Sequence, residues 1–241
     1  MQGETKIKPV FKCPEEYKTT FKNAKCLLTI SVGQEVHEGE KFKTTIDLIN
    51  NWFKECTILI DDTLQRHSMK LSSSLSIEEL YLKSLEEGRK WLQRNNSILN
   101  TLKIPFNITY WDKWLSHKNY KNQYEKITKL YKQDINYKES FDIAIHDFLE
   151  RYIPRLPKNI KINKKEAFSL CLEYLKEECT ALCLWIEENA QFEVYPSKRN
   201  QAMSITHEIF VKPYYPGLLL PVAIKFKNRK QLKPQKLIID I

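Results

Sequence analysis

Residues 24–31, with the sequence AKCLLTIS, form the short apolar run that decides the fold. A run of this length is typical of a strand that is buried on both faces, as in a parallel sheet. Residues 56–61, CTILID, repeat the pattern, and further strands are predicted at 104–110 and 191–195. One more apolar run, GLLLPVAI, lies at 217–224 near the C-terminus.

Segments with helical periodicity separate these runs. The predicted helices cover residues 43–54, 76–103, 118–153 and 163–187. Ser76 and Glu79 have the spacing of a capping box at the start of the second helix. Strands that alternate with helices indicate a single α/β domain, in which helices cover both faces of a mostly parallel sheet. Functional residues are then expected at the carboxyl ends of the strands, after Ile30, after Ile60 and at Tyr195.

The composition excludes several classes of protein. Hydrophobic residues make up 42% of the 241 residues and charged residues 29%, which is ordinary for a soluble globular protein. The chain has no apolar run long enough for a membrane helix and no apolar segment typical of a signal peptide, so we expect a cytoplasmic protein. Only 5 residues are glycine, and none of them forms a phosphate-binding glycine motif.

The cysteines and the net charge give two further expectations. The 6 cysteines form no C-x-x-C pair, so we expect buried, reduced thiols and no metal site. The net charge of +9 favours a polyanionic partner, with nucleic acid first and an acidic membrane second.

Three short motifs carry possible chemistry. Ser31 ends the first strand, and Gly33 follows it in a loop whose backbone N–H groups are suited to an oxyanion hole. Tyr174 and Glu178 are four residues apart on a predicted helix, so they share a face on which they are suited to bind an ammonium group. Tyr195 and Pro196 end another strand.

The order and spacing of these motifs resemble the tRNA-dependent cyclodipeptide synthases. The matches are Ser31-Val32-Gly33-Gln34, Tyr174 with Glu178, and Tyr195, and they are supported by GRKWLQRN at 88–95 and ITYWDKWL at 108–115. Gln34 and Tyr195-Pro196 are similar to the X-Y-P subfamily. The resemblance covers roughly residues 24–225, and the acidic loop EVHEGEK after Gln34 departs from it.

The resemblance implies a Rossmann-like domain similar to the catalytic domains of class I aminoacyl-tRNA synthetases. It implies that two aminoacyl-tRNAs are joined into a cyclic dipeptide without ATP or another cofactor. In the implied mechanism, Ser31 is the nucleophile, Tyr174 and Glu178 bind the aminoacyl ammonium, and Tyr195 relays a proton. Gly33, Gln34 and Pro196 are expected beside the substrate.

Two predictions concern substrate and tRNA recognition. Glu193 shares a strand face with Tyr195, so its carboxylate is expected either to line an aminoacyl pocket for a polar or cationic side chain or to face water. The resemblance assigns tRNA binding to the helix at 76–103, which carries Lys83, Arg89, Lys90 and Arg94. The basic tail is a second candidate for phosphate contacts.

The expected organisation is a polar N-terminal arm at 1–22, the catalytic domain at 23–228 and a basic tail at 229–241, in a monomeric protein. Two other functions stay open. A non-catalytic RNA-binding module would keep the basic helix without needing Ser31, Tyr174 and Glu178, whereas an aminoacyl-tRNA-dependent transferase with a linear product would need these residues but no ring closure.

Overall fold

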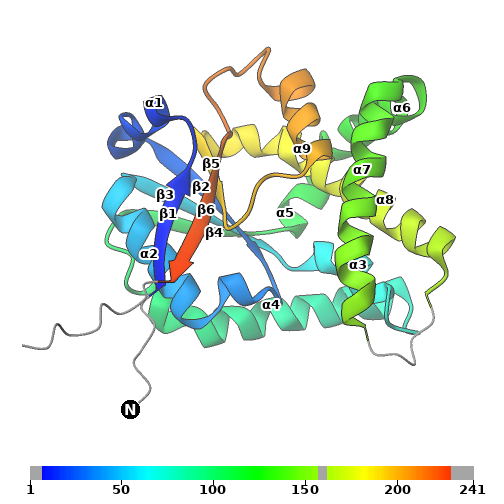
Figure 1. Ribbon diagram of the computed structural model, residues 1–241, viewed down its shortest axis with the longest axis horizontal. Helices are drawn as coiled ribbons and strands as arrows, with labels where there is room; N and C mark the ends of the chain where they lie inside the picture. Colours follow the sequence, from blue (N-terminus) through cyan, green and yellow to red (C-terminus); the bar gives the residue numbers. More distant parts are fainter. Residues whose placement is uncertain (1–6, 157–161, 229–241) are drawn as a thin grey trace, which may run out of the picture.

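A six-stranded sheet forms the centre of the computed structural model, which describes residues 7–156 and 162–228 (Figure 1). The strands follow the order β1-β6-β5-β2-β3-β4. Their bounds are β1 (Ile7–Lys12), β2 (Lys25–Ser31), β3 (Glu55–Asp61), β4 (Phe106–Tyr110), β5 (Phe192–Tyr195) and β6 (Leu220–Asn228). Every neighbouring pair is parallel except β1 with β6.

Helices pack on both faces of this sheet, as the alternating sequence pattern predicts. Side chains of α2 (Gly39–Trp52) and α4 (Ile77–Leu99) join one buried cluster with the sheet, and α4 runs along the lower edge of Figure 1. The opposite cluster contains α8 (Lys164–Leu184) and α9 (Gln201–Thr206). The predicted α/β class is therefore confirmed.

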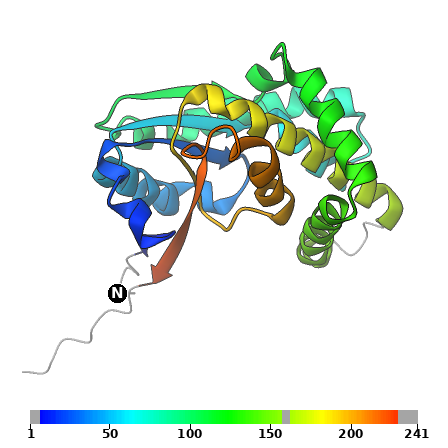
Figure 2. The same ribbon diagram turned by 90° about the horizontal axis from the view of Figure 1, so that it is seen from above.

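Two further long helices extend the second layer. The helices α6 (Tyr120–Gln133) and α7 (Ile135–Tyr152) pack against α8 and gather at the end of the molecule away from α2 (Figure 2). The single helix predicted over 118–153 is wrong, because Asp134 adopts an extended conformation between them and its carboxylate caps α7 at the Tyr137 N–H. The remaining α-helices of the described residues are short: α1 (Glu15–Lys18), α3 (Arg66–Lys70) and α5 (Asp112–Leu115).

The N-terminal segment differs from the polar arm expected at 1–22. From Ile7 onward it forms β1 at the edge of the sheet, and Phe11 packs edge-on against Phe21 and Phe53. Lysines on the exposed side of this strand give it a polar composition, which hides its buried side from a composition-based prediction. The basic tail at 229–241 lies outside the described residues.

Strand alternation divides the side chains of β2, β3 and β5 between the two layers. Cys26, Leu28 and Ile30 of β2 point into the cluster with α2 and α4. Leu27 points toward α8, and Ser31 shares its side of the strand. Because Ser31 pairs with Asp61 in the parallel register of β2 and β3, both side chains face the α8 layer at the carboxyl end of the sheet.

Candidate active site

The sheet has its topological switch point between β2 and β5. From β2 the chain proceeds to β3 and β4 on one side, and later fills β5 and β6 on the other. Ligands of open α/β sheets bind beyond the carboxyl ends of the strands at such a point. Ser31 and Tyr195 end the two flanking strands, and their hydroxyl oxygens are 3.1 Å apart. The fold thus brings together two residues that are 164 positions apart in the sequence.

The turn after Ser31 explains the Ser-x-Gly-x spacing. The Gln34 N–H donates to the Ser31 carbonyl at 3.2 Å, which closes a four-residue turn. Gly33 occupies the third position with φ = +85°, a conformation that disfavours residues with a Cβ and is required at this point of a type II turn. Gln34 is exposed beyond the turn.

The helix α8 places Tyr174 and Glu178 over the carboxyl end of the sheet. The Asn200 side chain caps α9 through its oxygen and donates through its nitrogen to Glu178 Oε2 at 3.0 Å. Burial raises the pKa of Glu178 to about 7, and the charge of Glu193 adds to this effect. Burial raises the pKa of Tyr174 well above its ordinary value, with a smaller contribution from the Glu178 charge. The two residues therefore share a face, as predicted.

Tyr195 is a neutral hydroxyl at physiological pH. Burial raises its pKa to about 12, although the hydrogen bond with Ser31 opposes the shift. His37 lies beside the Tyr195 ring, with ring centroids 5.5 Å apart. Burial lowers the pKa of His37 to about 3, so this imidazole is also uncharged at neutral pH. No sequence motif marked His37, which lies in the loop that departs from the family pattern.

Asp61 is the acidic residue at this edge that the sequence motifs missed. Its side chain is 4% exposed, and its Oδ1 atom has no hydrogen-bond partner among the described residues. Burial raises its pKa well above the ordinary value, and the Glu178 charge is the next cause. The sequence contains a signal that could have identified it: an aspartate ends an otherwise apolar strand, at a position where functional residues were expected.

Glu193 is buried, which rules out the alternative in which it faces water. Its carboxylate forms an ion pair with Arg199, whose Nη2 atom also donates to the Leu219 carbonyl at 2.7 Å. Glu193 therefore has a cationic partner within the chain, and its place near an aminoacyl pocket stays a prediction. Pro196 is partly buried directly after β5.

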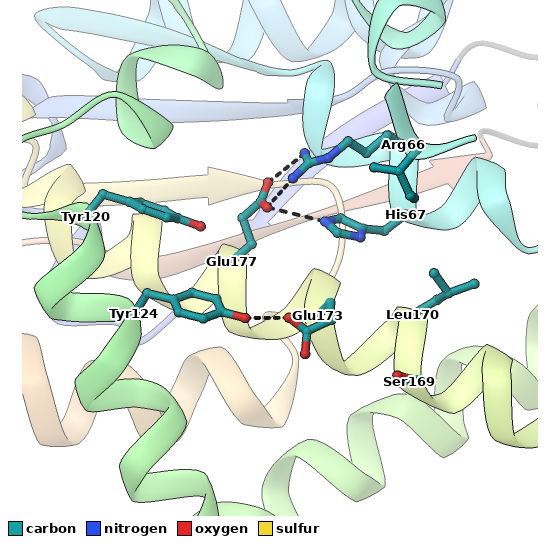
Figure 3. Close-up of a pocket in the computed structure, with 9 residues that line it drawn as sticks. Arg66, His67, Tyr120, Tyr124, Ser169, Leu170, Glu173 and Glu177 are labelled. Atoms are coloured by element: carbon teal, nitrogen blue, oxygen red, sulfur yellow. Dashed lines mark hydrogen bonds and ion pairs between the residues drawn. The ribbon is translucent and has the colours of Figure 1, made fainter. Parts of the chain in front are cut away.

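An adjacent face of α8 forms a second cluster, beside a cavity of about 350 Å³ (Figure 3). Arg66 binds both carboxylate oxygens of Glu177, at 2.9 and 2.5 Å, and the Trp111 indole donates to the same carboxylate at 2.7 Å. Burial would raise the pKa of Glu177, but hydrogen bonds from His67 and Arg66 bring it below its ordinary value. This ion pair fixes α8, and with it Tyr174 and Glu178, against α3.

The predicted tRNA-binding helix α4 carries both signs of charge. Its basic residues are Lys83, Arg89, Lys90 and Arg94, and its acidic residues are Glu78, Glu79, Glu86 and Glu87. Lys90 pairs with Glu86 at 2.8 Å, and Arg94 pairs with Glu38 at 2.8 Å. The exposed helix α6 is more basic, since it carries Lys121, Lys126, Lys129 and Lys132 but a single acidic residue, Glu125.

The described residues contain neither a membrane-spanning helix nor a metal-binding cluster. Within 7–156 and 162–228, no helix has both the length and the apolar character needed to cross a membrane. Over the same ranges, no group of three or more histidine, cysteine, aspartate or glutamate residues is arranged to hold a metal ion.

Comparisons with known proteins identify the family. The chain is 43% identical to a cyclodipeptide synthase (CDPS) of Fluoribacter dumoffii, with a TM-score of 0.88 over 92% of this chain and 100% of that chain. It is 17% identical to the cyclodipeptide synthase of Candidatus Glomeribacter gigasporarum, which was solved bound to Phe-tRNAPhe (TM-score 0.73, 91% and 95% of the chains). No protein-family model and no curated protein sequence matches the chain.

A third structure places the fold more broadly. A Mycobacterium tuberculosis protein matches with a TM-score of 0.63 at 10% identity, over 94% of this chain and 96% of that chain. Its structure demonstrated that cyclodipeptide synthetases are related to type I tRNA synthetases, so the predicted synthetase-like fold is confirmed. On the 43% identity across nearly its whole length, the chain belongs to the cyclodipeptide synthase family.

Proposed function

We propose that this protein transfers aminoacyl groups from two aminoacyl-tRNAs to form a cyclodipeptide, and that Ser31 carries the first group as an ester. The observation that carries the proposal is the pairing of Ser31 and Tyr195 at the switch point, beneath Tyr174 and Glu178. Family membership supports the reaction class, and the relative bound to Phe-tRNAPhe supports an aminoacyl-tRNA as the donor. Gln34 stands at the variable position of the X-Y-P pattern, and Tyr195-Pro196 match its tyrosine and proline, so this is the subfamily we propose.

In the first step, the Ser31 hydroxyl attacks the ester carbonyl of the first aminoacyl-tRNA. A new ester bond forms at Ser31, the ester bond to the ribose breaks, and the serine proton leaves with the ribose oxygen. The Gly33 N–H, in the turn beside Ser31, is suited to stabilise the tetrahedral oxyanion. Tyr174 and Glu178 hold the ammonium group and so orient the carbonyl.

In the second step, the amine of the second aminoacyl group attacks the Ser31 ester. One amide bond forms, and the serine is released with its proton. The remaining amine then attacks the dipeptidyl ester, which closes the ring and releases the second tRNA. An amine must be neutral to attack, and the Glu178 carboxylate is suited to accept its proton. Tyr195 is placed to relay a proton during closure.

We propose that the exposed side chains of Lys83, Arg89, Lys90 and Arg94 on α4 contact tRNA phosphates. The ion pairs of Lys90 and Arg94 lie at the surface, where solvent screens them and they contribute little to stability. Phosphates can therefore replace the glutamates at little cost. The more basic helix α6 is the alternative tRNA-binding surface. Removing basic side chains from each helix separately distinguishes the two surfaces.

The direct test is incubation of the protein with a mixture of charged tRNAs, followed by mass spectrometry of small products. A 2,5-diketopiperazine that is absent with Ser31→Ala supports the proposal. A linear dipeptide as the sole product would favour a transferase without ring closure. Binding of tRNA without any product would favour the RNA-binding module.

A further inference from the structure

Asp61 lies beside the nucleophile on the floor of the site. The register of the parallel strands pairs Asp61 of β3 with Ser31 of β2. Residues paired in this way point to the same side of a sheet, so both side chains face the layer that carries Tyr174 and Glu178. Asp61 is therefore at the same level as the seryl oxygen, one strand away from it.

The carboxylates around this site differ in their ion-pair and hydrogen-bond partners. Glu193 has the guanidinium of Arg199, and Glu178 accepts from Asn200. Asp61 Oδ1 is buried and has no partner within the described residues. A buried carboxylate without a partner is costly, and such a group calls for a ligand. The pKa of Asp61 is raised first by burial and then by the Glu178 charge, so the two acids repel each other when both are ionised.

We propose that Asp61 is a second anionic ligand of the α-ammonium group on the aminoacyl unit at Ser31, opposite Glu178. The inference rests on the proposed function. The ammonium is the one cation that every aminoacyl-tRNA carries, and its nitrogen is two bonds from the carbonyl carbon that Ser31 attacks. A cation held between Asp61 and Glu178 would relieve their repulsion and favour the ionised form of both.

The proposal predicts that Asp61 recognises the α-ammonium group of the aminoacyl unit rather than its side chain. The test compares two probes for single-turnover loading of Ser31. One is the aminoacyl-tRNA that gives the main product of the unaltered enzyme. The other is the same charged tRNA after nitrous acid has converted its α-ammonium into a hydroxyl. The unaltered enzyme should load the first probe faster.

Asp61→Asn keeps the shape of the side chain but removes its charge. We expect this variant to lose about 10- to 100-fold of the preference for the ammonium probe, the range of one charge-assisted hydrogen bond. Its rate with the hydroxyl probe should change little, which separates a lost contact from a damaged site. Asp62→Asn is the matched control, because Asp62 is the neighbouring buried acid but its carboxylate caps the Thr63 N–H.

An unchanged preference in a folded Asp61→Asn enzyme would overturn the proposal. If the set of amino acids in the product changes at the same time, Asp61 would instead be assigned to side-chain selection. If the unaltered protein loads neither probe and forms no cyclodipeptide, the proposed function itself fails, which is a distinguishable outcome.

Discussion

The two faces of the sheet are built from the same strands but differ in their side chains, because one face is apolar and the other also carries polar groups. Toward α2 and α4, β2 and β3 present only apolar side chains, such as Leu28 and Ile58. Toward α8, the same strands present Ser31 and Asp61 at their carboxyl ends. Neighbouring residues on one strand thus belong to different environments. The apolar face secures the strands, and this allows the opposite face to hold polar groups whose burial is unfavourable.

The largest expected effect is on the polar face. Ser31→Ala should lower product formation by roughly 10³-fold or more, because it removes the proposed nucleophile. The melting temperature should stay within a few degrees, since only a hydroxyl is lost. Product assays and thermal melts of the same preparation check both parts, and turnover near that of the unaltered enzyme would rule out serine catalysis.

Glu193 offers the next largest effect, this time on stability. Glu193→Leu leaves the buried Arg199 without its partner, which should cost about 3–5 kcal/mol of unfolding free energy. Replacing Arg199 by Met as well should recover much of this loss, because no unpaired charge remains. Denaturant titrations of the single and double variants measure it. Equal stability of the two would show that the ion pair does not govern this part of the polar face.

Ile58 tests the apolar face. Ile58→Ala should lower the free energy of unfolding by about 2–5 kcal/mol through the cavity it leaves. For a chain of this size, about 1 kcal/mol shifts the melting temperature by about 2–4 °C. Activity per folded molecule should hardly change at low temperature. A loss of activity larger than the loss of folded protein would mean that the two faces are not separable.

Substitution of Glu178 should change both stability and activity. In the folded protein the pKa of Glu178, about 7, lies above the ordinary glutamate value, so ionisation of Glu178 opposes folding. The contribution of Glu178 to the free energy of unfolding is therefore fully present in acid and declines as the pH rises through 7. Glu178→Gln should therefore be about 1–3 kcal/mol more stable than the unaltered protein at pH 8, with no gain at pH 4. Cyclodipeptide formation should fall sharply. Thermal melts across this pH range check the sign, and a gain that is largest in acid would contradict it.

The smallest effects concern the surface. Replacing Lys83, Lys90 and Arg94 by alanine should reduce the salt dependence of tRNA binding by a slope of roughly 1 per lost contact. The matched control replaces Lys121, Lys129 and Lys132 of α6, which removes the same charge. Binding titrations at several salt concentrations compare the two. If only the α6 variant flattens the slope, the tRNA lies on α6 instead.

The apolar face could be predicted from the sequence, because its signals are local. The runs at 24–31 and 56–61 and the capping box at Ser76 each identify an element, and the structure confirms them. Ser31, Tyr174 and Tyr195 were predicted as site residues because their spacing resembles that of a family. Asp61 was not singled out because its place beside Ser31 depends on the register of β2 with β3, and the sequence of neither strand reveals how the two pair.

The ion pair between Glu193 and Arg199 could not be predicted from the sequence either. Glu193 has its partner Arg199 six residues away, across the end of β5, and neither residue alone indicates the pair. The edge strand β1 was missed because its buried side is reduced to Phe11 among lysines. In each case the deciding contact involves a second segment of the chain.

Intact-mass analysis of the protein tests the central claim most directly. The protein is incubated with one charged tRNA that contributes to its product, quenched in acid and weighed, and the peptide that contains Ser31 is then sequenced by mass spectrometry. We predict an added mass equal to one aminoacyl group on Ser31, absent from Ser31→Ala and lost when the second charged tRNA is supplied. Cyclodipeptide formation without any such adduct, or an adduct that persists in Ser31→Ala, would contradict catalysis by Ser31 on the polar face of the sheet.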